Sequence, residues 1–440
     1  MNKSIMIQGT ASDVGKSLIV AGLCRIYSDR GVNVFPFKSQ NMALNSYITA
    51  TGDEMSRAQM VQSEAARRAP DIRMNPVLLK PLKGSRTSII FNGKQLDTIP
   101  AREYYKEKWK LKAKIKQIYD VVASENELVI IEGAGSPAEI NLNKDDFVNM
   151  GMAEIADSPV ILVADIDRGG VFASIYGTIK LLSDEEQSRI KGIIINKFRG
   201  DISLLKDGLT MIEELVDVPV IGVIPYIDLK IDSEDSLALN HLPCEFDTTK
   251  DIDVAVLKLD WLKNFNEFNS LSMFEDVSVR YINKPSQLNH PDVLIIPDTE
   301  EIEGNLSKLK QEGLISLIND LATKGTNIIA FGNSDKLLDA KLQSRAIDLD
   351  ENQVKETLFE KDWEDIIEGN ILTVNFTGLF EYLNWTRNLL NHIRLRSGKL
   401  SLQPPQLNYS EFKNQQYDVL ANHLKQYLDL DALDRIINKK

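Results

Sequence analysis

A glycine-rich segment near the start of the chain constrains the fold more than any other feature. The segment GTASDVGKS, Gly9 to Ser17, follows the short apolar run Ser4 to Gln8 and precedes the apolar stretch LIVAGLCRIY. A strand, a glycine-rich turn and a helix in this order surround an anion with backbone N–H groups and a helix N-terminus. Lys16 would reach the terminal phosphates of ATP, and Ser17 would bind Mg2+. We therefore expect a nucleotide-binding unit built on a parallel sheet.

The spacing of this loop separates it from two other classes of nucleotide-binding protein. The residues TASDV between Gly9 and Gly15 make it one residue longer than the G-x4-G-K-[ST] loop of ordinary GTPases. Partitioning ATPases similar to ParA and MinD carry an additional lysine early in the loop, and the stretch Thr10 to Asp13 contains none. Both classes are disfavoured.

The first 230 residues repeat one pattern, in which β-branched apolar runs end in polar residues or glycine and helical patterns follow. The runs lack polar alternation, as is typical of parallel strands buried on both faces. We predict an α/β fold whose first sheet contains strands at Ser4 to Gln8, Val32 to Lys38, Glu127 to Glu132, Pro159 to Asp165, Lys191 to Asn196 and Val218 to Ile224.

A second, smaller α/β unit follows a change in composition at residues 228–250, which are rich in Asp, Ser and Thr. We place the domain boundary between 246 and 247, giving domains 1–246 and 247–440. The stretch 343–370 is acidic and helix-like, and the last 30 residues read as two amphipathic helices. The lysine-rich segment 106–116 favours a helix that begins near Arg102. Strands of the second unit are predicted at Ile252 to Lys258, Val277 to Tyr281, Val293 to Pro297 and Thr326 to Phe331.

Composition limits partners and compartment. With 51 Lys and Arg against 64 Asp and Glu, the net charge is −13, which disfavours nucleic acid as a partner. The two cysteines, Cys24 and Cys244, offer neither a disulfide framework nor a zinc motif. Because no signal-like or membrane-length apolar run is present, we expect a cytoplasmic protein without a membrane partner.

Polar residues at two further strand ends indicate the chemistry. Glu132 ends a buried run in VIIEGAGSPAEINL and suits a magnesium contact, while Lys38 ends the second strand. Lys38 is followed by the polar residues Ser39, Gln40, Asn41 and Asn45. Carboxyl ends of parallel strands meet at one edge, where open sheets bind ligands. We predict activation of a substrate carboxylate by ATP, in which Mg2+ and lysine neutralise the transferring phosphoryl group.

Several long motifs resemble the cobyric acid synthase family. They cover residues 1 to about 240 almost continuously, and the resemblance resumes at DWLKNFNEFNSL, VSVRYINKPSQL and the C-terminal segment that begins YSEFKNQQ. The motifs are GTASDVGKS, PFKSQNMALNS, EMSRAQMVQSEAA, MNPVLLKP, EGAGSPAEINL, NMGMAEIAD, DIDRGGVFASIYGT and INKFRGD. The resemblance implies ATP- and glutamine-dependent amidation of four corrin-ring carboxylates of adenosylcobyrinic acid a,c-diamide. It also implies a first half similar to dethiobiotin synthetase and a second, flavodoxin-like half similar to a class I glutamine amidotransferase.

The resemblance also assigns roles to residues. Loop residues that would hold ATP are Gly9, Thr10, Asp13, Gly15, Lys16 and Ser17, with Asn196 and Lys197 at the adenine base. Candidate metal ligands are Ser17, Glu54 and Glu132. Candidate catalytic residues are Lys16, Lys38 and Asp146, and candidate substrate residues are Gln40, Asn41 and Arg168.

The second half departs from the family at the residues that hydrolyse glutamine. The segment AFGNSDK places Gly332 where the family has its nucleophilic cysteine, and no cysteine follows Cys244. The segment TVNFTGLF places Thr377 where the family has its histidine, and PDTE replaces an oxyanion-binding loop. A thiolate must attack the glutamine amide. We therefore predict an inactive glutaminase unit and an ammonia-dependent ligase.

Three alternatives stay open at this stage. The nitrogen donor is either free ammonia or the product of a separate glutaminase. A chain that lost catalysis altogether would be a nucleotide-binding scaffold or regulator, which corrinoid-stimulated ATP hydrolysis would distinguish from an enzyme. The third alternative is an amide ligase for another polycarboxylate, although the near-continuous motif match in the first half favours a corrinoid.

Overall fold

The buried apolar runs of the first half form one sheet of six parallel strands, as predicted. The computed structural model of the chain describes residues 3–43, 46–49, 51–82, 85–141, 145–232, 242–356 and 370–438. The sheet order is β12-β11-β10-β1-β9-β2, and every neighbouring pair is parallel. The strands are β1 (Lys3–Gly9), β2 (Val34–Phe37), β9 (Leu128–Glu132), β10 (Val160–Asp165), β11 (Ile190–Phe198) and β12 (Val220–Pro225).

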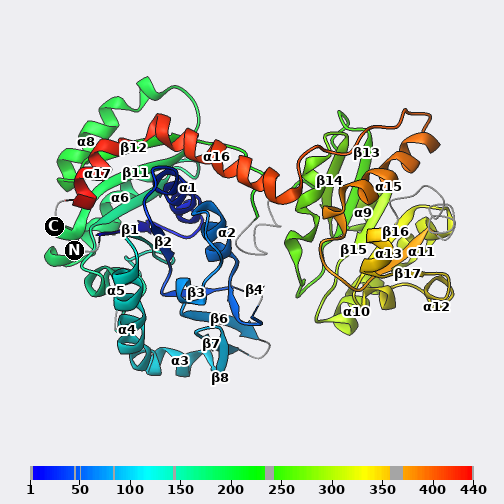
Figure 1. Cartoon of the computed structure of the whole chain (residues 1–440), viewed down its shortest axis with the longest axis horizontal. Helices are drawn as coiled ribbons and strands as arrows, with labels where there is room; N and C mark the ends of the chain where they lie inside the picture. The colour runs from blue at the N-terminus through cyan, green and yellow to red at the C-terminus, as the bar shows by residue number, and fades with distance from the viewer. Residues whose placement is uncertain are drawn as a thin grey trace. The chain divides into compact units, whose positions relative to one another are not determined.

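Helices cover both faces of this sheet (Figure 1). Side chains of a strand alternate between faces, so Ile5 and Ile7 of β1 belong to one buried cluster and Met6 to the other. Burial on both faces explains why the strands are continuously apolar. The helices are α1 (Lys16–Asp29), α2 (Arg57–Ala65), α3 (Ala101–Glu107), α4 (Trp109–Glu125), α5 (Met150–Ile155), α6 (Val171–Lys180), α7 (Asp184–Arg189), α8 (Lys206–Val216), α16 (Tyr409–Tyr427) and α17 (Leu430–Asn438).

The strand register brings the polar strand ends together. Ile7 lies opposite Glu132, Gly9 lies opposite Val163, and Asp165 lies opposite Asn196. The carboxyl ends of β1, β9, β10 and β11 therefore meet at the edge where the glycine-rich loop begins.

Two small sheets lie between β2 and α3 in the chain and were not predicted as strands. One has the order β3-β6-β7-β8, and the other is an antiparallel pair, β4 and β5. The helix expected near Arg102 is confirmed, with a junction at Lys108 between α3 and α4. The strands are β3 (Gln40–Met42), β4 (Ser46–Ile48), β5 (Glu54–Ser56), β6 (Val77–Leu82), β7 (Arg86–Phe91) and β8 (Lys94–Pro100).

The second half contains another parallel sheet, with the order β14-β13-β15-β16-β18-β17. Its four predicted strands are confirmed, and β17 and β18 are additional. The acidic stretch 343–370 contains β17 and one short helix, and residues 357–369 lie outside the described residues. The strands are β13 (Ile252–Leu257), β14 (Val277–Ile282), β15 (Val293–Ile296), β16 (Asn327–Phe331), β17 (Ile347–Leu349) and β18 (Ile371–Val374). The helices are α9 (Pro285–Leu288), α10 (Ile302–Gln311), α11 (Leu314–Thr323), α12 (Ala340–Gln343), α13 (Glu351–Glu356) and α15 (Leu383–Arg396).

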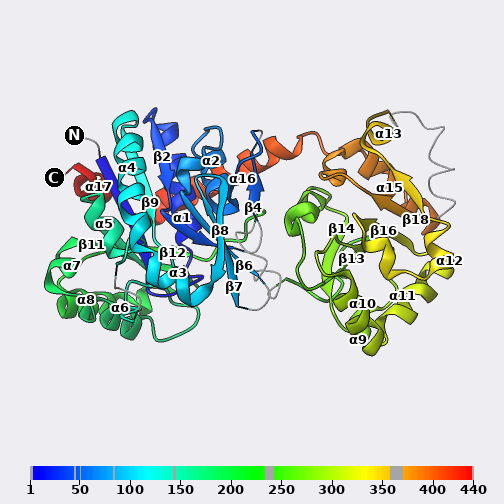
Figure 2. The same ribbon diagram turned by 90° about the horizontal axis from the view of Figure 1, so that it is seen from below.

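The chain forms two compact units, and the division differs from a single boundary at 246/247. Unit 1 comprises residues 1–234 and 414–440, and unit 2 comprises residues 235–413. The last residues return to unit 1 because the apolar faces of α16 and α17 complete the core around α1 (Figure 2). Within the described residues, no helix is both long and apolar enough to cross a membrane.

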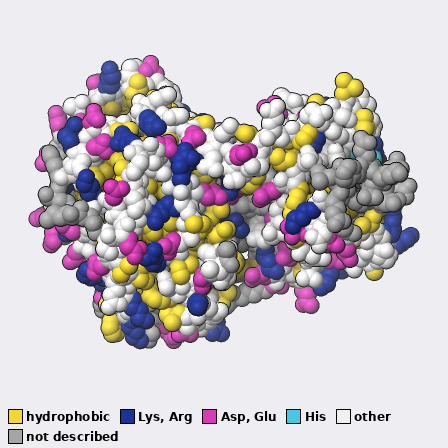
Figure 3. Space-filling model, viewed as in Figure 1, with side chains coloured by type: hydrophobic (Ala, Val, Ile, Leu, Met, Phe, Trp, Pro, Cys, Tyr) yellow, Lys and Arg dark blue, Asp and Glu magenta, His cyan; other side chains and the backbone are white. Residues whose placement is uncertain are grey.

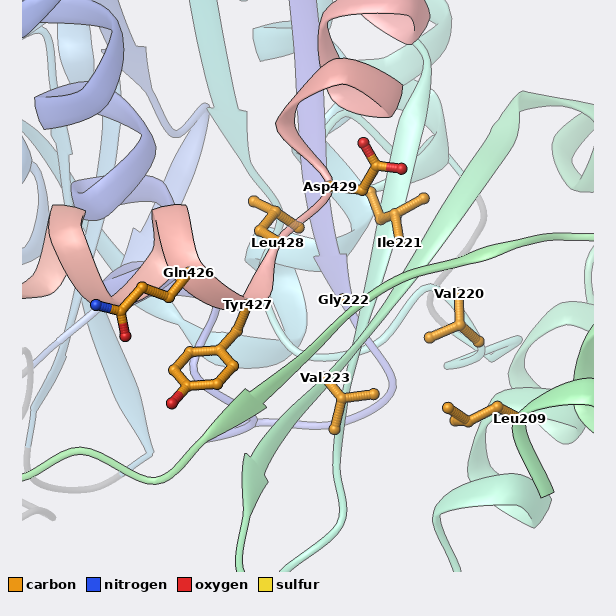
Figure 4. A pocket seen from close by; sticks show the side chains of 9 residues that line it. All are labelled: Leu209, Val220, Ile221, Gly222, Val223, Gln426, Tyr427, Leu428 and Asp429. Atoms are coloured by element: carbon orange, nitrogen blue, oxygen red, sulfur yellow. The ribbon is translucent and has the colours of Figure 1, made fainter. Parts of the chain in front are cut away.

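The returning segment also covers part of the edge strand of the first sheet. Leu428, between α16 and α17, forms an antiparallel bridge with Gly222 of β12, and the backbone N–H of Asp429 donates to Ile221 O at 2.8 Å. A shallow pocket of about 330 Å³ lies here between β12, α8 and the returning segment (Figure 4). No residue of the glycine-rich loop lines it.

Candidate active site

The glycine-rich loop leaves no space for side chains at its two ends. Gly9 ends β1, and a Cβ built there would lie 2.6 Å from Val14 Cγ2. Gly15 caps α1 with a φ of 100°, and a Cβ there would lie 2.1 Å from Asn196 Nδ2. The Asn196 amide donates to Val14 O at 2.9 Å and so supports the loop from β11. The loop is therefore shaped by its backbone, as a phosphate cradle requires.

Lys16 lies across this cradle. Its Nζ donates to Ala11 O at 2.9 Å and to Gly135 O at 3.1 Å, and the residue is only 7% exposed. Thr10, at the start of the loop, donates its backbone N–H to Val163 O at 2.9 Å. The ammonium group is thus held against the loop, where a nucleotide's phosphates would meet it.

Glu132 is the centre of the polar cluster beside the loop. Its Oε1 accepts hydrogen bonds from Ser17 Oγ at 2.9 Å and from Lys38 Nζ at 2.8 Å. Its Oε2 accepts a hydrogen bond from the amide of Gln62, on α2. Glu132 is 1% exposed, so the carboxylate depends on these donors in place of water. The structure brings together three of the predicted residues: Ser17, Lys38 and Glu132.

The chemistry of this cluster fits Mg2+. Ser17 Oγ and Glu132 Oε1 are hard oxygen donors that face each other at 2.9 Å. Protein sites commonly hold Mg2+ by one or two side chains together with phosphate oxygens and water. Among the described residues, no group of three or more His, Cys, Asp or Glu side chains is arranged so that it could hold a metal ion. Ser17 and Glu132 would therefore hold the ion jointly with the nucleotide.

Glu54, predicted as a third ligand, has other partners. It accepts hydrogen bonds from Ser46 Oγ on the paired strand β4 and from Lys80 Nζ on β6, the latter at 2.6 Å. These contacts tie the β4–β5 pair to the neighbouring sheet. Among the described residues, they are its hydrogen-bond and ion-pair partners.

A second polar group lies on the other side of the loop. Lys197 Nζ donates to Asp13 O at 2.5 Å and to Asp165 Oδ2 at 2.9 Å. Arg168, 60% exposed at its side chain, lies 3.7 Å from Asp13 and 3.8 Å from Asp165. The structure thus places Arg168 next to the nucleotide loop, whereas the sequence grouped it with the substrate residues Gln40 and Asn41.

Asp146, predicted as catalytic, and Asn41, predicted to contact the substrate, form hydrogen bonds within unit 1. The Asp146 carboxylate accepts from the backbone N–H groups of Val148 at 2.9 Å and Gly151 at 2.7 Å, which shapes the turn into α5. Asn41 is 5% exposed and donates to Ser56 Oγ at 2.5 Å. Both residues serve the walls of the site through these contacts.

The wall beside β3 combines polar, apolar and basic groups. Gln40 accepts a hydrogen bond from the Tyr104 hydroxyl, on α3. Burial lowers the pKa of Lys108, at the α3–α4 junction, and the nearby Asp146 and Asp145 oppose that shift. Exposed apolar side chains gather over α3 and β6–β8, with basic side chains around them (Figure 3). Asn45 lies outside the described residues.

Sequence reasoning missed Gln62 and Asp165 as site residues. Gln62 lies within the quoted segment EMSRAQMVQSEAA, three residues after Gln59, so both amides share the buried face of α2. Two glutamines on the buried face of a helix are a usable signal, because buried amides require hydrogen-bond partners. Asp165 ends β10 as Glu132 ends β9, and its position was the corresponding signal.

Gly332, the predicted position of the missing nucleophile, lies in a turn at the end of β16. Gly332 follows β16 with a φ of 60°, and its N–H donates to Val374 O at 2.9 Å. A Cβ at Gly332 would lie 2.4 Å from Asp298 Cγ. Asp298 is held there by Lys263 Nζ at 3.2 Å and by the N–H of Thr299 at 2.9 Å. The Asp298 carboxylate therefore fills the space that a cysteine side chain would need.

A carboxylate also lies beside Thr377, the predicted position of the missing histidine. Thr377 is exposed, and the next two backbone N–H groups, of Gly378 and Leu379, both donate to Glu267 Oε1. Ser334 is fully buried, and its hydroxyl donates to Pro297 O at 2.5 Å. Within the described residues, no cysteine is present in unit 2 other than Cys244.

Comparisons with known proteins agree with both units. The CobQ/CobB/MinD/ParA nucleotide binding domain family matches residues 5–237, and the CobB/CobQ-like glutamine amidotransferase domain family matches residues 253–331. The second match ends at the residue before Gly332. Full-length relatives were found as well.

A cobyric acid synthase from Streptococcus sanguinis is 44% identical, and the alignment covers 100% of both chains. Its 497 aligned positions exceed the 440 residues of this chain, so this chain lacks segments that the relative has. A cobyric acid synthase from Limosilactobacillus reuteri is 43% identical over 99% of this chain and 98% of that one. One from Listeria monocytogenes is 41% identical over 99% of this chain and 97% of that one. This chain belongs to the cobyric acid synthase family.

Proposed function

We propose that this chain is an ATP-dependent ligase that amidates the b, d, e and g side-chain carboxylates of adenosylcobyrinic acid a,c-diamide in adenosylcobalamin synthesis. We further propose that it uses ammonia, from solution or from a separate glutaminase, as the nitrogen donor. The observation that carries the ligase function is the convergence of Ser17, Lys38 and Glu132 beside the phosphate loop. The observation that carries ammonia use is the Asp298 carboxylate at the nucleophile position.

The proposed reaction has two balanced steps. A carboxylate oxygen of the corrinoid attacks the γ-phosphorus of ATP, the bond to the β,γ-bridging oxygen breaks, and ADP leaves behind an acyl phosphate. Ammonia then attacks the acyl carbon, and the bond from that carbon to the phosphate oxygen breaks. Inorganic phosphate leaves, the nitrogen gives up one proton, and a primary amide remains. Such phosphoryl transfer depends on positioning and charge neutralisation.

The residues of the loop supply the positioning. Lys16, fixed across the loop, would neutralise the terminal phosphates, and the backbone around Gly9 and Gly15 would cradle them. Asn196, at the end of β11, would lie at the base, as the family resemblance implies. Bound Mg2+ would lower the negative charge of the triphosphate and would be held by Ser17 and Glu132.

Lys38 would act at the acceptor. Lys38 is 3% exposed, and its Nζ lies 2.8 Å from Glu132 Oε1. An acceptor carboxylate that approaches the phosphate loop along β3 would meet Lys38, because this lysine lies in the two-residue connection between β2 and β3. A lysine there can neutralise a carboxylate or a transferring phosphoryl group.

The test is turnover by the purified full-length chain with ATP, Mg2+ and the corrinoid, and with either ammonium or glutamine as donor. We expect stepwise mass changes from carboxylate to amide with ammonium and none with glutamine. Amidation with glutamine by protein free of other glutaminases would contradict ammonia use. ATP hydrolysis that the corrinoid does not stimulate would contradict the ligase function and favour a scaffold.

A further inference from the structure

The buried face of α2 carries several polar side chains, which is unusual for a buried surface. Gln59 and Gln62 are both 0% exposed and lie three residues apart on this face. The helix is fixed at its start by Ser56, whose hydroxyl accepts the N–H of Ala58 at 3.2 Å. Buried amides lose water and destabilise the fold unless they find partners. Their partners therefore indicate why the chain places amides here.

The two amides form a chain of hydrogen bonds that ends on Glu132. Gln59 Nε2 donates to Gln62 Oε1 at 3.4 Å, and Gln62 Nε2 donates to Glu132 Oε2. Because the Gln62 carbonyl accepts from Gln59, its NH2 group is directed at the carboxylate. The orientation of Gln62 thus follows from its own partners.

These hydrogen bonds give the two carboxylate oxygens of Glu132 different partners. Oε2 is bound by Gln62, and Oε1 is left to Ser17 and Lys38. Without the Gln62 amide, Glu132 Oε2 would lose this donor in a site that is 1% exposed, and Lys38 would be the stronger influence on how the carboxylate turns. Residues that hydrogen-bond a metal ligand set its orientation and tune its affinity for the ion.

We propose that Gln62 is a positioning residue that holds the Glu132 carboxylate with Oε1 toward Ser17, so that the pair can bind a divalent cation with the nucleotide. This inference rests on the proposed function only in assigning a divalent cation to Ser17 and Glu132. Gln62 acts through Glu132, and Gln59 acts on Glu132 only through Gln62.

The test measures cation binding and needs no corrinoid, so it separates this inference from the proposed ligase function. Mn2+ serves as the probe, titrated by electron paramagnetic resonance into the full-length chain with saturating ATP. We expect Gln62→Met, which keeps the volume and removes the amide, to weaken Mn2+ binding about 10- to 100-fold. Binding of a fluorescent ATP analogue in EDTA should change less than about twofold, because Gln62 does not reach the phosphate loop's backbone donors.

Gln59→Met is the matched control, since it removes a buried amide from the same helix face one turn earlier. We expect the fold-change in Mn2+ affinity for Gln59→Met to be less than a third of the fold-change for Gln62→Met. Both variants should lower the melting temperature. Equal Mn2+ affinity for Gln62→Met and wild type, with only a lower melting temperature, would show that Gln62 is structural and would overturn the proposal.

A double-mutant cycle distinguishes an effect through Glu132 from a general loss of folding. Gln62→Asn keeps an amide that is one methylene too short, and it should weaken Mn2+ binding by an intermediate factor. In a Glu132→Gln background, Gln62→Met should cause no further loss of Mn2+ affinity, because the residue through which it acts is gone. Additive losses in the two variants would mean that Gln62 does not work through Glu132.

Discussion

At the scale of single residues, Gly332, the predicted position of the missing nucleophile, lies against the side chain of Asp298. Its φ is 60°, and a Cβ built there would lie 2.4 Å from Asp298 Cγ. Glycine is the residue without a Cβ, so it alone fits beside the carboxylate without movement. The glycine at position 332 and the placement of the Asp298 carboxylate therefore depend on each other.

Gly332→Cys should consequently destabilise the chain without restoring glutaminase activity. We expect a loss of about 1–3 kcal/mol in the free energy of unfolding, from crowding against Asp298. Gly332→Cys combined with Asp298→Ala should recover most of that loss, and denaturant unfolding of the wild type and these two variants measures it. Neither variant should hydrolyse glutamine, because Thr377 supplies no base. A fully stable single variant would show that Asp298 moves aside freely.

The two cysteines should differ in reactivity. Cys24 of α1 is fully buried, and desolvation raises the pKa of its thiol far above the ordinary value, with Arg68 opposing and Glu132 adding to the shift. Cys244 is half-buried. At pH 8 a thiol-specific reagent should modify one cysteine in the native protein and both in denaturant. Rapid modification of both in the native state would contradict the packing of α1.

The same shift has a consequence for stability. The folded thiol of Cys24 keeps its proton while the unfolded thiol ionises near a pKa of about 8.5. A group whose folded pKa is raised stabilises the fold below the unfolded pKa and loses that contribution as pH rises. Unfolding free energy should therefore fall above about pH 8.5, and less steeply in Cys24→Ala.

How far the site could be predicted depended on whether a residue's position follows from the sequence around it. Lys16 and Ser17 were identified because strand, loop and helix fix their positions within a few residues, and Glu132 because it ends a buried strand. Asp146 was predicted to be catalytic. Its carboxylate accepts hydrogen bonds from backbone N–H groups two and five residues ahead, in the turn into α5, and the sequence pattern did not indicate these contacts. Gln62 and Asp298 act on residues far along the chain, and only the folded structure shows those distances.

At the scale of elements, α16 is part of the core of unit 1. Leu424 is fully buried, and a Cβ at Gly22 of α1 would lie 2.3 Å from Leu424 Cδ1. The glycine lets the two helices approach closely. Tyr27 Oη also donates to Asp434 Oδ1 of α17 at 2.7 Å, so polar contacts add to the apolar ones.

Leu424→Ala should therefore destabilise unit 1. We expect a loss of about 2–5 kcal/mol in unfolding free energy, as for other leucine truncations in a core. Val419→Ala in the same helix is the control, because Val419 is 46% exposed, and it should change stability by less than about 0.5 kcal/mol. Thermal and denaturant unfolding give both values. Similar losses in the two variants would mean that α16 is not packed as described.

Elements differed in how well the sequence predicted them. Ten strands were predicted, because a strand that is buried on both faces requires a continuous apolar segment. The strands β6 to β8 were not, since Lys80 and Pro81 interrupt β6 and polar residues dominate β8. The amphipathic pattern of α16 and α17 showed that they bury one face but could not show which core that face joins.

At the scale of the whole molecule, unit 2 is an insertion into unit 1. The chain leaves unit 1 after residue 234 and returns at residue 414. Within unit 1 the two connections lie side by side, because the N–H of Lys230 donates to Gln416 Oε1 at 3.0 Å. Leu229 and Ile231 also pack against the cluster that contains Tyr417. Unit 1 thus needs the C-terminal residues for its core. The contacts described near the insertion are made between residues of unit 1 alone.

A chain that lacks residues 235–413, with 234 joined to 414 by a short flexible linker, should therefore fold as unit 1 and bind ATP like the full-length protein. Ending the chain at residue 413 should instead expose the apolar surface around α1 and yield aggregated or loosely folded protein. Circular dichroism melts and binding of a fluorescent ATP analogue compare the two deletions. If the truncated chain folded and the bridged chain did not, the C-terminal helices would be accessory, and unit 2 would be what completes the nucleotide-binding unit.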